Sequence, residues 1–555
     1  MTVHSPPPAA ELRIDDLLAR QVCERPECIF LRDTSRALSF AQVEEQVARL
    51  AGGLRRQGIA PGDRVALMLP NGVDFVLLWL ACARLQALCV FVNPAYIGAM
   101  LDYVLDDAHP NALISHGSVV PNIATASAEV LGRLEWLCMI EPAAAASVEM
   151  HGTRRRVSYP ELFDADAFAA MPAGGDPVQN CVIYTSGTTG PSKGVVLSTI
   201  AVLAGSRTFV ALTELTARDI LYTPLPLFHG LASRQGVLGC LIAGAEVVIG
   251  HRFSASRFWD EVRAADATVA HTMFNLPPML KAQPPHPLER EHRLRALYNA
   301  NHDAEFEDRF GVPLLEAYGL VETGITIYSP CSLRKPGSCG TLHRDWEAQI
   351  VDAAGNVLPD GETGELLLRP KRAHLFMSGY LNKPEATLDA CRDFWFHTGD
   401  FLSRDPDGHF YFAGRQKERI RRRGENVSAW EIERIASGHP AVRLCAAIGY
   451  RAAVGDDDIR LVLTLKDGAI VTHASLAEWL AARMPPFMVP RYIEIVNTLP
   501  LTPTSKVRKS ELIDSGFRGA VWDRERSVIV PPESVCATVS AGVGAALPDA
   551  DGAIA

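Results

Sequence analysis

The chain has 555 residues, of which 48% are hydrophobic and 21% charged, as in ordinary globular proteins. This length exceeds what one hydrophobic core supports, so we expect two or more domains. The 64 acidic and 54 basic residues give a net charge of -10, which argues against a nucleic-acid partner. The 12 cysteines include no C-x-x-C pair, which indicates reduced thiols rather than a zinc site.

The N-terminal segment, MTVHSPPPAAELRIDD, lacks the basic and apolar regions of a secretory signal peptide. The most apolar window, Phe75–Val92, is interrupted by Arg84 and Gln86, which argues against a membrane span. We expect a buried helix over Phe75–Leu85 that runs into a strand over Ala87–Val92. These features predict a cytoplasmic protein with no membrane span.

Strand-like runs alternate with helix-length segments from about residue 37 to residue 370, which predicts an α/β architecture with largely parallel sheets. Residues 349–412 instead contain short β-rich runs separated by turn signals, typical of a small antiparallel or barrel-like unit. The expected strands are Arg64–Leu69, Ala112–Ile114, Val182–Tyr184, Ala245–Ile249, Leu314–Ala317, Ala348–Val351, Gly364–Arg369 and Gly408–Phe412.

A compact α+β unit follows, with a helix that ends at Gly438 and Pro440 and strands at Leu461–Leu465 and Tyr492–Val496. Beyond Phe517 the sequence turns irregular and ends in small residues, so we expect a disordered tail. The predicted division is therefore a large N-terminal domain (1–415), a small mobile C-terminal domain (416–515) and a tail (516–555).

Residues 184–198, YTSGTTGPSKGVVLS, form the most informative stretch of the chain. Gly187, Gly190 and Gly194 alternate with hydroxyl-bearing residues around Lys193, and apolar runs flank the stretch. Glycines allow close approach of the backbone to an anion, and hydroxyl and N–H groups donate to its oxygens. The pattern predicts a phosphate-binding loop between two strands that is not a Walker A loop. The alternative is a Gly/Thr-rich hairpin with a solvated lysine.

Four further motifs accompany this loop. They are Tyr318–Glu322 after a predicted strand, Trp395–Asp400 with its aspartate on a tight turn, Gly414-Arg415, and Leu499–Lys506 with one lysine. Each has an ordinary structural explanation: a core tyrosine, a turn-forming aspartate, a surface ion pair and a solvated lysine. Their occurrence together in this order favours a shared chemical role.

The set of motifs resembles the adenylate-forming superfamily of acyl-CoA synthetases, 4-coumarate-CoA ligases, luciferases and peptide-synthetase adenylation domains, over about residues 15–512. The stretches 252–269, 283–295 and 421–433 are similar to crotonobetaine/carnitine-CoA ligase-type enzymes. The resemblance implies a reaction of an acid with ATP to give an acyl-adenylate, and then with CoA to give a thioester.

The resemblance also implies residue roles in binding ATP. Tyr318 would stack on adenine, Asp400 and Arg415 would bind the ribose, and Glu322 would help to hold Mg²⁺. The β- and γ-phosphates would bind a loop that comprises Thr185, Ser186, Gly187, Thr188, Thr189, Gly190 and Lys193.

In the C-terminal domain the resemblance implies a hinge at Lys417 and a catalytic lysine at Lys506. Arg423, Gly424 and Glu425 would line the CoA channel.

A carboxylate that attacks ATP brings two anions together, so a positioned ammonium and Mg²⁺ are needed where the charge develops. A closing C-terminal domain would keep water from the reactive mixed anhydride.

Two positions and one segment depart from the family pattern. Val321 stands where a threonine is usual, which removes a hydroxyl worth about 1–3 kcal/mol in a buried site, and Thr323 would lie too far along to replace it. Ser505 stands where a glycine usually precedes the lysine, and residues 298–302 replace a Gly-Ala-Pro turn. A catalytically weak nucleotide-binding relative therefore stays open.

Phe228 and His229 are expected to form a wall of the acyl pocket, although His229 could equally be a structural histidine that closes a turn. No acidic residue follows them, which argues against a free amino acid as substrate. A quaternary ammonium would need an aromatic cage, which Phe274, Tyr298 and Tyr328 alone do not identify. An organic or fatty acid, a carrier-protein acceptor in place of CoA, and a homodimer all stay open.

Overall fold

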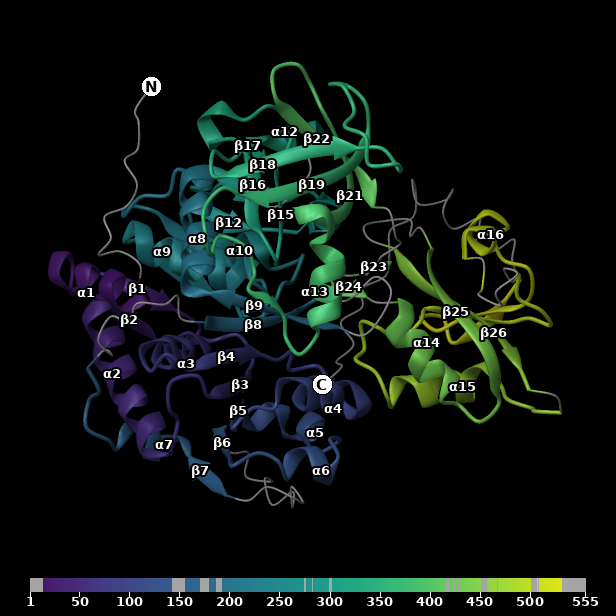
Figure 1. The fold of residues 1–555 in the computed structure, drawn as a ribbon, viewed down its shortest axis with the longest axis horizontal. Helices are drawn as coiled ribbons and strands as arrows, with labels where there is room; N and C mark the ends of the chain where they lie inside the picture. The colour runs from purple at the N-terminus through teal and green to yellow at the C-terminus, as the bar shows by residue number, and fades with distance from the viewer. Residues whose placement is uncertain are drawn as a thin grey trace. The chain divides into compact units, whose positions relative to one another are not determined.

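The computed structural model describes residues 13–141, 155–169, 179–185, 192–273, 276–281, 283–298, 302–415, 420–422, 425–427, 429–450, 457–466, 468–500, 507 and 509–531. These residues form two compact units (Figure 1). The first contains the described residues up to 415, and the second contains those from 420 onward.

The first unit contains an eight-stranded sheet that is parallel except at one edge. Its strands in spatial order are β20 (Gly379–Tyr380), β9 (Lys193–Ser198), β8 (Gln179–Thr185), β4 (Leu88–Phe91), β3 (Arg64–Met68), β5 (Ala112–His116), β6 (Trp136–Ile140) and β7 (Arg156–Ser158). β9 runs antiparallel to both β8 and β20. This hairpin edge carries the predicted phosphate loop.

A second sheet of the first unit has seven strands, parallel except between the last two. In spatial order they are β14 (Leu314–Leu315), β13 (Ala296–Tyr298), β12 (Val269–His271), β10 (Ile220–Thr223), β11 (Glu246–Ile249), β1 (Ile29–Arg32) and β2 (Ala37–Ser39). One large apolar core includes residues of both sheets, among them Val65 of β3 and Val247 of β11.

Helices of the first unit that have a wide apolar face pack it against these sheets. α3 (Val73–Arg84) is apolar almost all round and is buried along nearly its whole length, and Trp79 Nε1 donates to Asn180 Oδ1 at 2.9 Å. The other helices are α1 (Ile14–Glu24), α2 (Phe40–Arg56), α4 (Gly98–Ala108), α5 (Val120–Ile123), α6 (Ala128–Leu131), α7 (Tyr159–Phe163), α8 (Thr199–Thr213), α9 (Leu238–Ala243), α10 (Phe258–Ala265), α11 (Leu276–Lys281), α12 (Ala304–Phe310) and α13 (Pro384–Ala390).

A third sheet is antiparallel throughout. Its strands in spatial order are β15 (Ala317–Leu320), β16 (Gly324–Tyr328), β17 (Gly340–Leu342), β22 (His409–Arg415), β21 (Phe396–Arg404), β19 (Gly364–Pro370) and β18 (Trp346–Val351). The predicted antiparallel unit is therefore confirmed, and it begins earlier than predicted, at Ala317.

The second unit is an α+β fold around a five-stranded sheet, β25 (Val442–Tyr450), β26 (Asp458–Leu465), β27 (Tyr492–Ile495), β28 (Val521–Asp523) and β29 (Val528–Val530). A short hairpin, β23 (Ile420–Arg422) and β24 (Glu425–Val427), and the helices α14 (Ala429–Ser437), α15 (His473–Ala481) and α16 (Lys509–Asp514) complete it. The predicted α/β fold class with a separate C-terminal domain is confirmed.

The expected disordered tail is wrong for residues 516–531. β28 pairs with β27, and β29 pairs with β28, so both strands extend the sheet of the second unit. Phe517 packs on Tyr450 and Tyr492, and Val521 is fully buried. In the sequence, the apolar residues of these two short strands are separated by a charged turn, so they do not form a recognisable strand pattern. Residues 532–555 lie outside the described part of the chain.

The apolar window predicted to be a helix and a strand forms α3 and β4, as expected. Within the described residues, no helix combines the length and the apolar character that crossing a membrane requires.

Candidate functional site

The stem of the predicted phosphate loop is the β8–β9 hairpin, in which Thr185 stands opposite Lys193. The Thr185 hydroxyl donates to the carbonyl oxygen of Lys193 at 3.4 Å. Gly194 serves a purpose that the sequence did not indicate. A Cβ there would lie 2.8 Å from Val182 Cγ1 and 3.1 Å from Tyr184 Cζ, so glycine makes room for neighbouring side chains rather than for an anion.

Tyrosines anchor this stem to α4. The Tyr103 hydroxyl donates to the Ser192 carbonyl oxygen at 2.7 Å, and the Tyr184 hydroxyl donates to Asp107 Oδ2 at 2.9 Å. Burial and the Asp107 carboxylate raise the pKa of Tyr184 above its usual value. Lys383 forms an ion pair with the same carboxylate. The position of the stem is therefore determined by contacts outside the loop itself.

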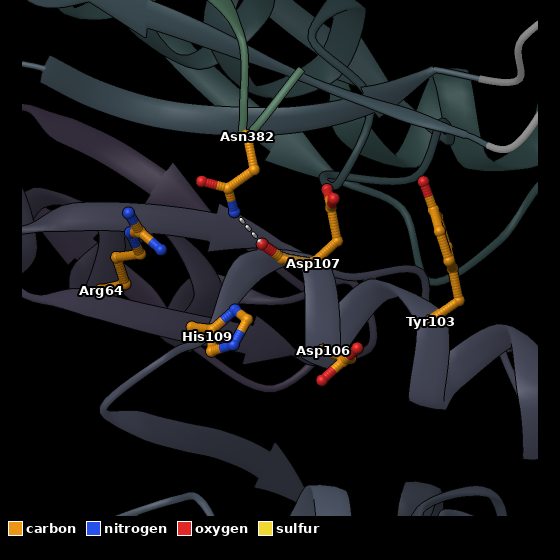
Figure 2. A pocket seen from close by; sticks show the side chains of 6 residues that line it. All are labelled: Arg64, Tyr103, Asp106, Asp107, His109 and Asn382. Carbon is orange, nitrogen blue, oxygen red and sulfur yellow. Dashed lines mark hydrogen bonds between the residues drawn. The ribbon is translucent and has the colours of Figure 1, made fainter. Parts of the chain in front are cut away.

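A surface pocket of about 490 Å³ lies beside these anchors and is lined by Arg64, Tyr103, Asp106, Asp107, His109 and Asn382. Figure 2 shows Asn382 reaching Asp107, with Arg64 and His109 on one side and Tyr103 on the other. Asn382 Nδ2 donates to the Asp107 carbonyl oxygen at 2.6 Å. The two acidic residues of the pocket form ion pairs, Asp107 with Lys383 and Asp106 with Arg133.

Tyr380 joins the phosphate-loop lysine to the carboxylate predicted to hold Mg²⁺. Lys193 Nζ lies 4.6 Å from the centroid of the Tyr380 ring, and the Tyr380 hydroxyl donates to Glu322 Oε1 at 2.9 Å. Tyr380 reaches this position because β20 pairs with β9, with Tyr380 opposite Val195. Sequence reasoning missed Tyr380, since a two-residue strand leaves no periodic pattern.

Glu322 lies in the turn between β15 and β16 and is only 8% exposed. Its carbonyl oxygen accepts from the Met377 N–H at 2.9 Å. In the same turn the Thr323 hydroxyl accepts from the Leu320 N–H at 3.2 Å and donates to the Gly324 carbonyl oxygen at 2.9 Å. The Thr323 hydroxyl therefore closes the turn, and it does not replace the hydroxyl that is missing at Val321.

Tyr318 and Asp400, which are 82 residues apart, are in direct contact. The Tyr318 hydroxyl donates to Asp400 Oδ2 at 2.9 Å, and both residues are buried. Asp400 stands opposite Arg415 in the β21–β22 pairing, and the side chain of Arg415 is outside the described part. The expected tight turn at Asp400 is wrong: Asp400 lies within β21, and the local bend is at Gly399, where φ is +68°.

Phe228 and His229 are half-buried and in ring contact, with centroids 4.5 Å apart. They precede a π-helix, η3 (Leu231–Val237), whose register is fixed by the Gln235 N–H donating to the Gly230 carbonyl oxygen at 3.0 Å. The π-helix carries Arg234, which sequence reasoning also missed. Its guanidinium donates from Nη1 to the Val321 carbonyl oxygen at 2.8 Å.

The structure thus brings together Thr185 and Lys193, Tyr318 and Asp400, and Lys193 and Glu322 through Tyr380. Glu425 is half-buried in β24 of the second unit. The roles predicted for the remaining residues stay predictions, because these residues lie outside the described part: Ser186, Gly187, Thr188, Thr189, Gly190, Lys417, Arg423, Gly424 and Lys506.

Residues 18–381 match the family model of the AMP-binding enzyme, and residues 431–506 match that of the AMP-binding enzyme C-terminal domain. The chain belongs to the AMP-binding enzyme family. This AMP-binding enzyme is 31% identical over 486 residues to a crotonobetaine/carnitine–CoA ligase of Salmonella paratyphi B, with 86% of this chain and 93% of the relative covered.

Solved structures agree on the fold of this AMP-binding enzyme. An amide bond synthetase, McbA, from Marinactinospora thermotolerans has a TM-score of 0.76 at 23% identity, covering 90% of this chain and 100% of that one. An o-succinylbenzoate CoA synthetase from Bacillus subtilis has a TM-score of 0.75 at 23% identity, covering 90% and 98%. The resemblance predicted from the motifs is confirmed, and the protein is an adenylating enzyme of the acyl-CoA ligase type.

Proposed function

We propose that this enzyme is an ATP-dependent carboxylate–CoA ligase that works through an acyl-adenylate. In the first step a carboxylate oxygen bonds to the α-phosphorus of ATP, and the bond to pyrophosphate breaks. In the second step the CoA thiol loses its proton, its sulfur bonds to the acyl carbon, and AMP leaves with the bonding electrons. One site would carry out both steps in turn.

The observation that carries the proposal is the contact series Lys193–Tyr380–Glu322. One tyrosine contacts both a cation of the predicted phosphate loop, over its ring face, and a buried carboxylate, through its hydroxyl. The Tyr318–Asp400 pair, on β15 and β21, supplies an aromatic ring next to a sugar-binding carboxylate. A nucleoside triphosphate needs all of these groups: a ring for its base, an acceptor for its ribose and charges for its phosphates.

The residues present fit a Mg²⁺ ion that is held mainly by the nucleotide. Within the described residues, no group of three or more acidic, histidine or cysteine side chains gathers into a metal cluster. A single carboxylate such as Glu322 is what Mg²⁺ commonly takes from a protein when phosphates and water supply the other ligands. When bound, the ion would neutralise negative charge on the phosphates.

The remaining assignments are parts of the same proposal. Lys506 would neutralise the approaching carboxylate and the α-phosphate, and Lys417 would be the hinge of a C-terminal domain that spans 416–515. Arg423, Gly424 and Glu425 would line the path of CoA. Ser186–Gly190 would complete the loop around the β- and γ-phosphates.

The test of this proposal is pyrophosphate release over a panel of carboxylic acids, with ATP and Mg²⁺, in the presence of either CoA or a holo-carrier protein. Acid-dependent pyrophosphate and acyl-CoA are expected. Thioester only on the carrier protein would favour the stand-alone adenylating alternative. No pyrophosphate with any acid would favour a nucleotide-binding relative without turnover, to which the missing hydroxyl at Val321 could contribute.

A further inference from the structure

Arg234 differs from the other fully buried arginines of the described chain. Arg84, Arg422 and Arg460 are each at most 3% exposed, and each has a carboxylate partner. Arg84 pairs with Asp15 and Glu44, Arg422 with Asp458, and Arg460 with Glu494. Arg234 is 2% exposed, and no carboxylate of the described residues lies within ion-pair distance of it. A buried charge without a partner is costly, so its presence needs a reason.

The backbone contacts of Arg234 use only part of its hydrogen-bonding capacity. A guanidinium has five N–H donors. Nη1 donates to the Val321 carbonyl oxygen at 2.8 Å, and Nη2 donates to that of Leu320 at a weak 3.5 Å. Nε is buried and has no partner among the described residues. The adjacent Gln235 Oε1 is also buried without one. The Nε–H donor of Arg234 is therefore left without an acceptor in the described part of the chain.

The position of Arg234 places this cation among the site residues. A Cβ on Gly230 would lie 3.3 Å from Arg234 Nε and 3.2 Å from Ile183 Cδ1. The guanidinium therefore packs against Gly230, next to His229. Its two carbonyl partners directly precede Glu322 in the β15–β16 turn. Arg234 lies in a π-helix, an uncommon element that is frequent at functional sites.

The charge environment leaves Arg234 cationic. Burial lowers the pKa of Arg234 from its usual value, and the negative charge of the nearby Glu322 carboxylate acts in the opposite direction. An arginine remains protonated in proteins at neutral pH. The Glu322 carboxylate already accepts from the Tyr380 hydroxyl and is the proposed Mg²⁺ ligand, so it does not neutralise Arg234 by itself.

We propose that Arg234 selects a dicarboxylic acid, by pairing with the carboxylate that is not activated. The inference rests on the proposed ligase function. Arginine is well suited to a carboxylate because its planar fork matches both oxygens. The same cation repels a quaternary ammonium, so an acid such as the carnitine named for the relatives is disfavoured in this enzyme. The selected substrate therefore differs in charge from that of those relatives.

Binding calorimetry tests the preference independently of turnover. The acids are succinate, glutarate and adipate, their monocarboxylate counterparts butanoate, pentanoate and hexanoate, and 4-(trimethylammonio)butanoate as a cationic acid. We expect at least one dicarboxylate to bind about 10- to 100-fold more tightly than the monocarboxylate of equal carbon number, as a charged hydrogen bond provides. Arg234→Met is expected to abolish the difference, and Arg234→Lys to retain part of it.

The matched control is Arg293→Met, which makes the same chemical change at an exposed arginine that pairs with Asp266. It is expected to leave the preference unchanged, and a melting curve shows whether each variant folds. The inference is overturned if the wild type prefers the monocarboxylate or the cationic acid. It is also overturned if Arg234→Met weakens binding of every acid alike, because that result would mean only a structural role in the turn.

Pyrophosphate release with the same panel separates the two proposals. Release with monocarboxylates and no charge preference would refute the role of Arg234 and leave the ligase function standing. A binding preference for dicarboxylates without any pyrophosphate release would refute the ligase function and leave the role of Arg234 standing.

Discussion

Replacing Tyr380 with phenylalanine removes one hydroxyl from the contact series and leaves the ring in place. The lost interaction is a 2.9 Å hydrogen bond to a carboxylate that is 8% exposed, from a tyrosine that is 9% exposed. A hydrogen bond to a charged group contributes about 1.5–3 kcal/mol, and in this buried setting water cannot restore it. The ring face that holds Lys193 at 4.6 Å is retained, so the cation–π contact of about 0.5–2 kcal/mol survives.

The expected result is a selective loss in the use of Mg²⁺. Groups that orient a metal-binding carboxylate typically change metal affinity by about 10- to 100-fold when removed. We therefore expect Tyr380→Phe to raise the Mg²⁺ concentration for half-maximal ATP–pyrophosphate exchange by about that factor. Tyr380→Leu, which also removes the ring face, should additionally raise the KM for ATP. The acid preference should not change in either variant.

The assay is ATP–pyrophosphate exchange over a range of Mg²⁺ concentrations, with melting curves as a folding control. An unchanged Mg²⁺ requirement in Tyr380→Phe would refute the reasoning that this hydroxyl orients Glu322. An equal effect of the phenylalanine and leucine variants on the KM for ATP would refute the separate role of the ring.

The other predictions concern catalysis, the departure from the family pattern, and acid stability. Lys506→Ala should slow acyl-adenylate formation by about 10²–10³-fold and largely spare thioester formation from a supplied acyl-adenylate, and an equal loss in both half-reactions would contradict its role. Val321→Thr should maintain or raise the rate of adenylation measured by exchange, whereas a large drop would mean that the turn does not accept a hydroxyl. His271 is buried between Phe209 and Tyr298, with Nδ1 3.0 Å from Thr223 Oγ1, and burial lowers its pKa from 6.5 to about 3. The unfolded chain then binds a proton that the folded chain does not, so stability is lost as pH falls from 6.5 toward 3, by at most about 1.4 kcal/mol per pH unit from this group. His271→Asn should show a smaller drop in melting temperature between pH 7 and pH 5, and parallel curves for the two proteins would argue against the assignment.

The parts of the fold that the sequence predicted are those with long, uniform patterns. The apolar window at Phe75–Val92 forms α3 and β4, which are buried almost throughout. Its length and apolar composition were therefore enough to predict both elements. The antiparallel sheet was predicted from turn signals between short β-rich runs. The strands β28 and β29 were missed because each has only three residues, too few for a recognisable alternating pattern.

Site residues were predictable where a short sequence motif by itself indicates the chemical role of its side chains. Lys193, Glu322, Tyr318 and Asp400 stand out in the sequence, and the structure brings them into two contact groups. Tyr380 was not predictable, because its role arises only when β20 pairs with a strand almost two hundred residues earlier. Arg234 was not predictable either. What distinguishes it from other arginines is that it is buried without a carboxylate partner among the described residues, and only the folded structure shows this.

Acid-dependent exchange of pyrophosphate into ATP by the full-length chain tests the central claim most directly, when it is measured without CoA and then repeated with CoA present. If one site first adenylates an acid and then forms a thioester, exchange should occur without CoA, and AMP and acyl-CoA should accumulate in equal amounts once CoA is added. Acyl-CoA formation without any exchange, or with release of ADP and phosphate, would contradict the account.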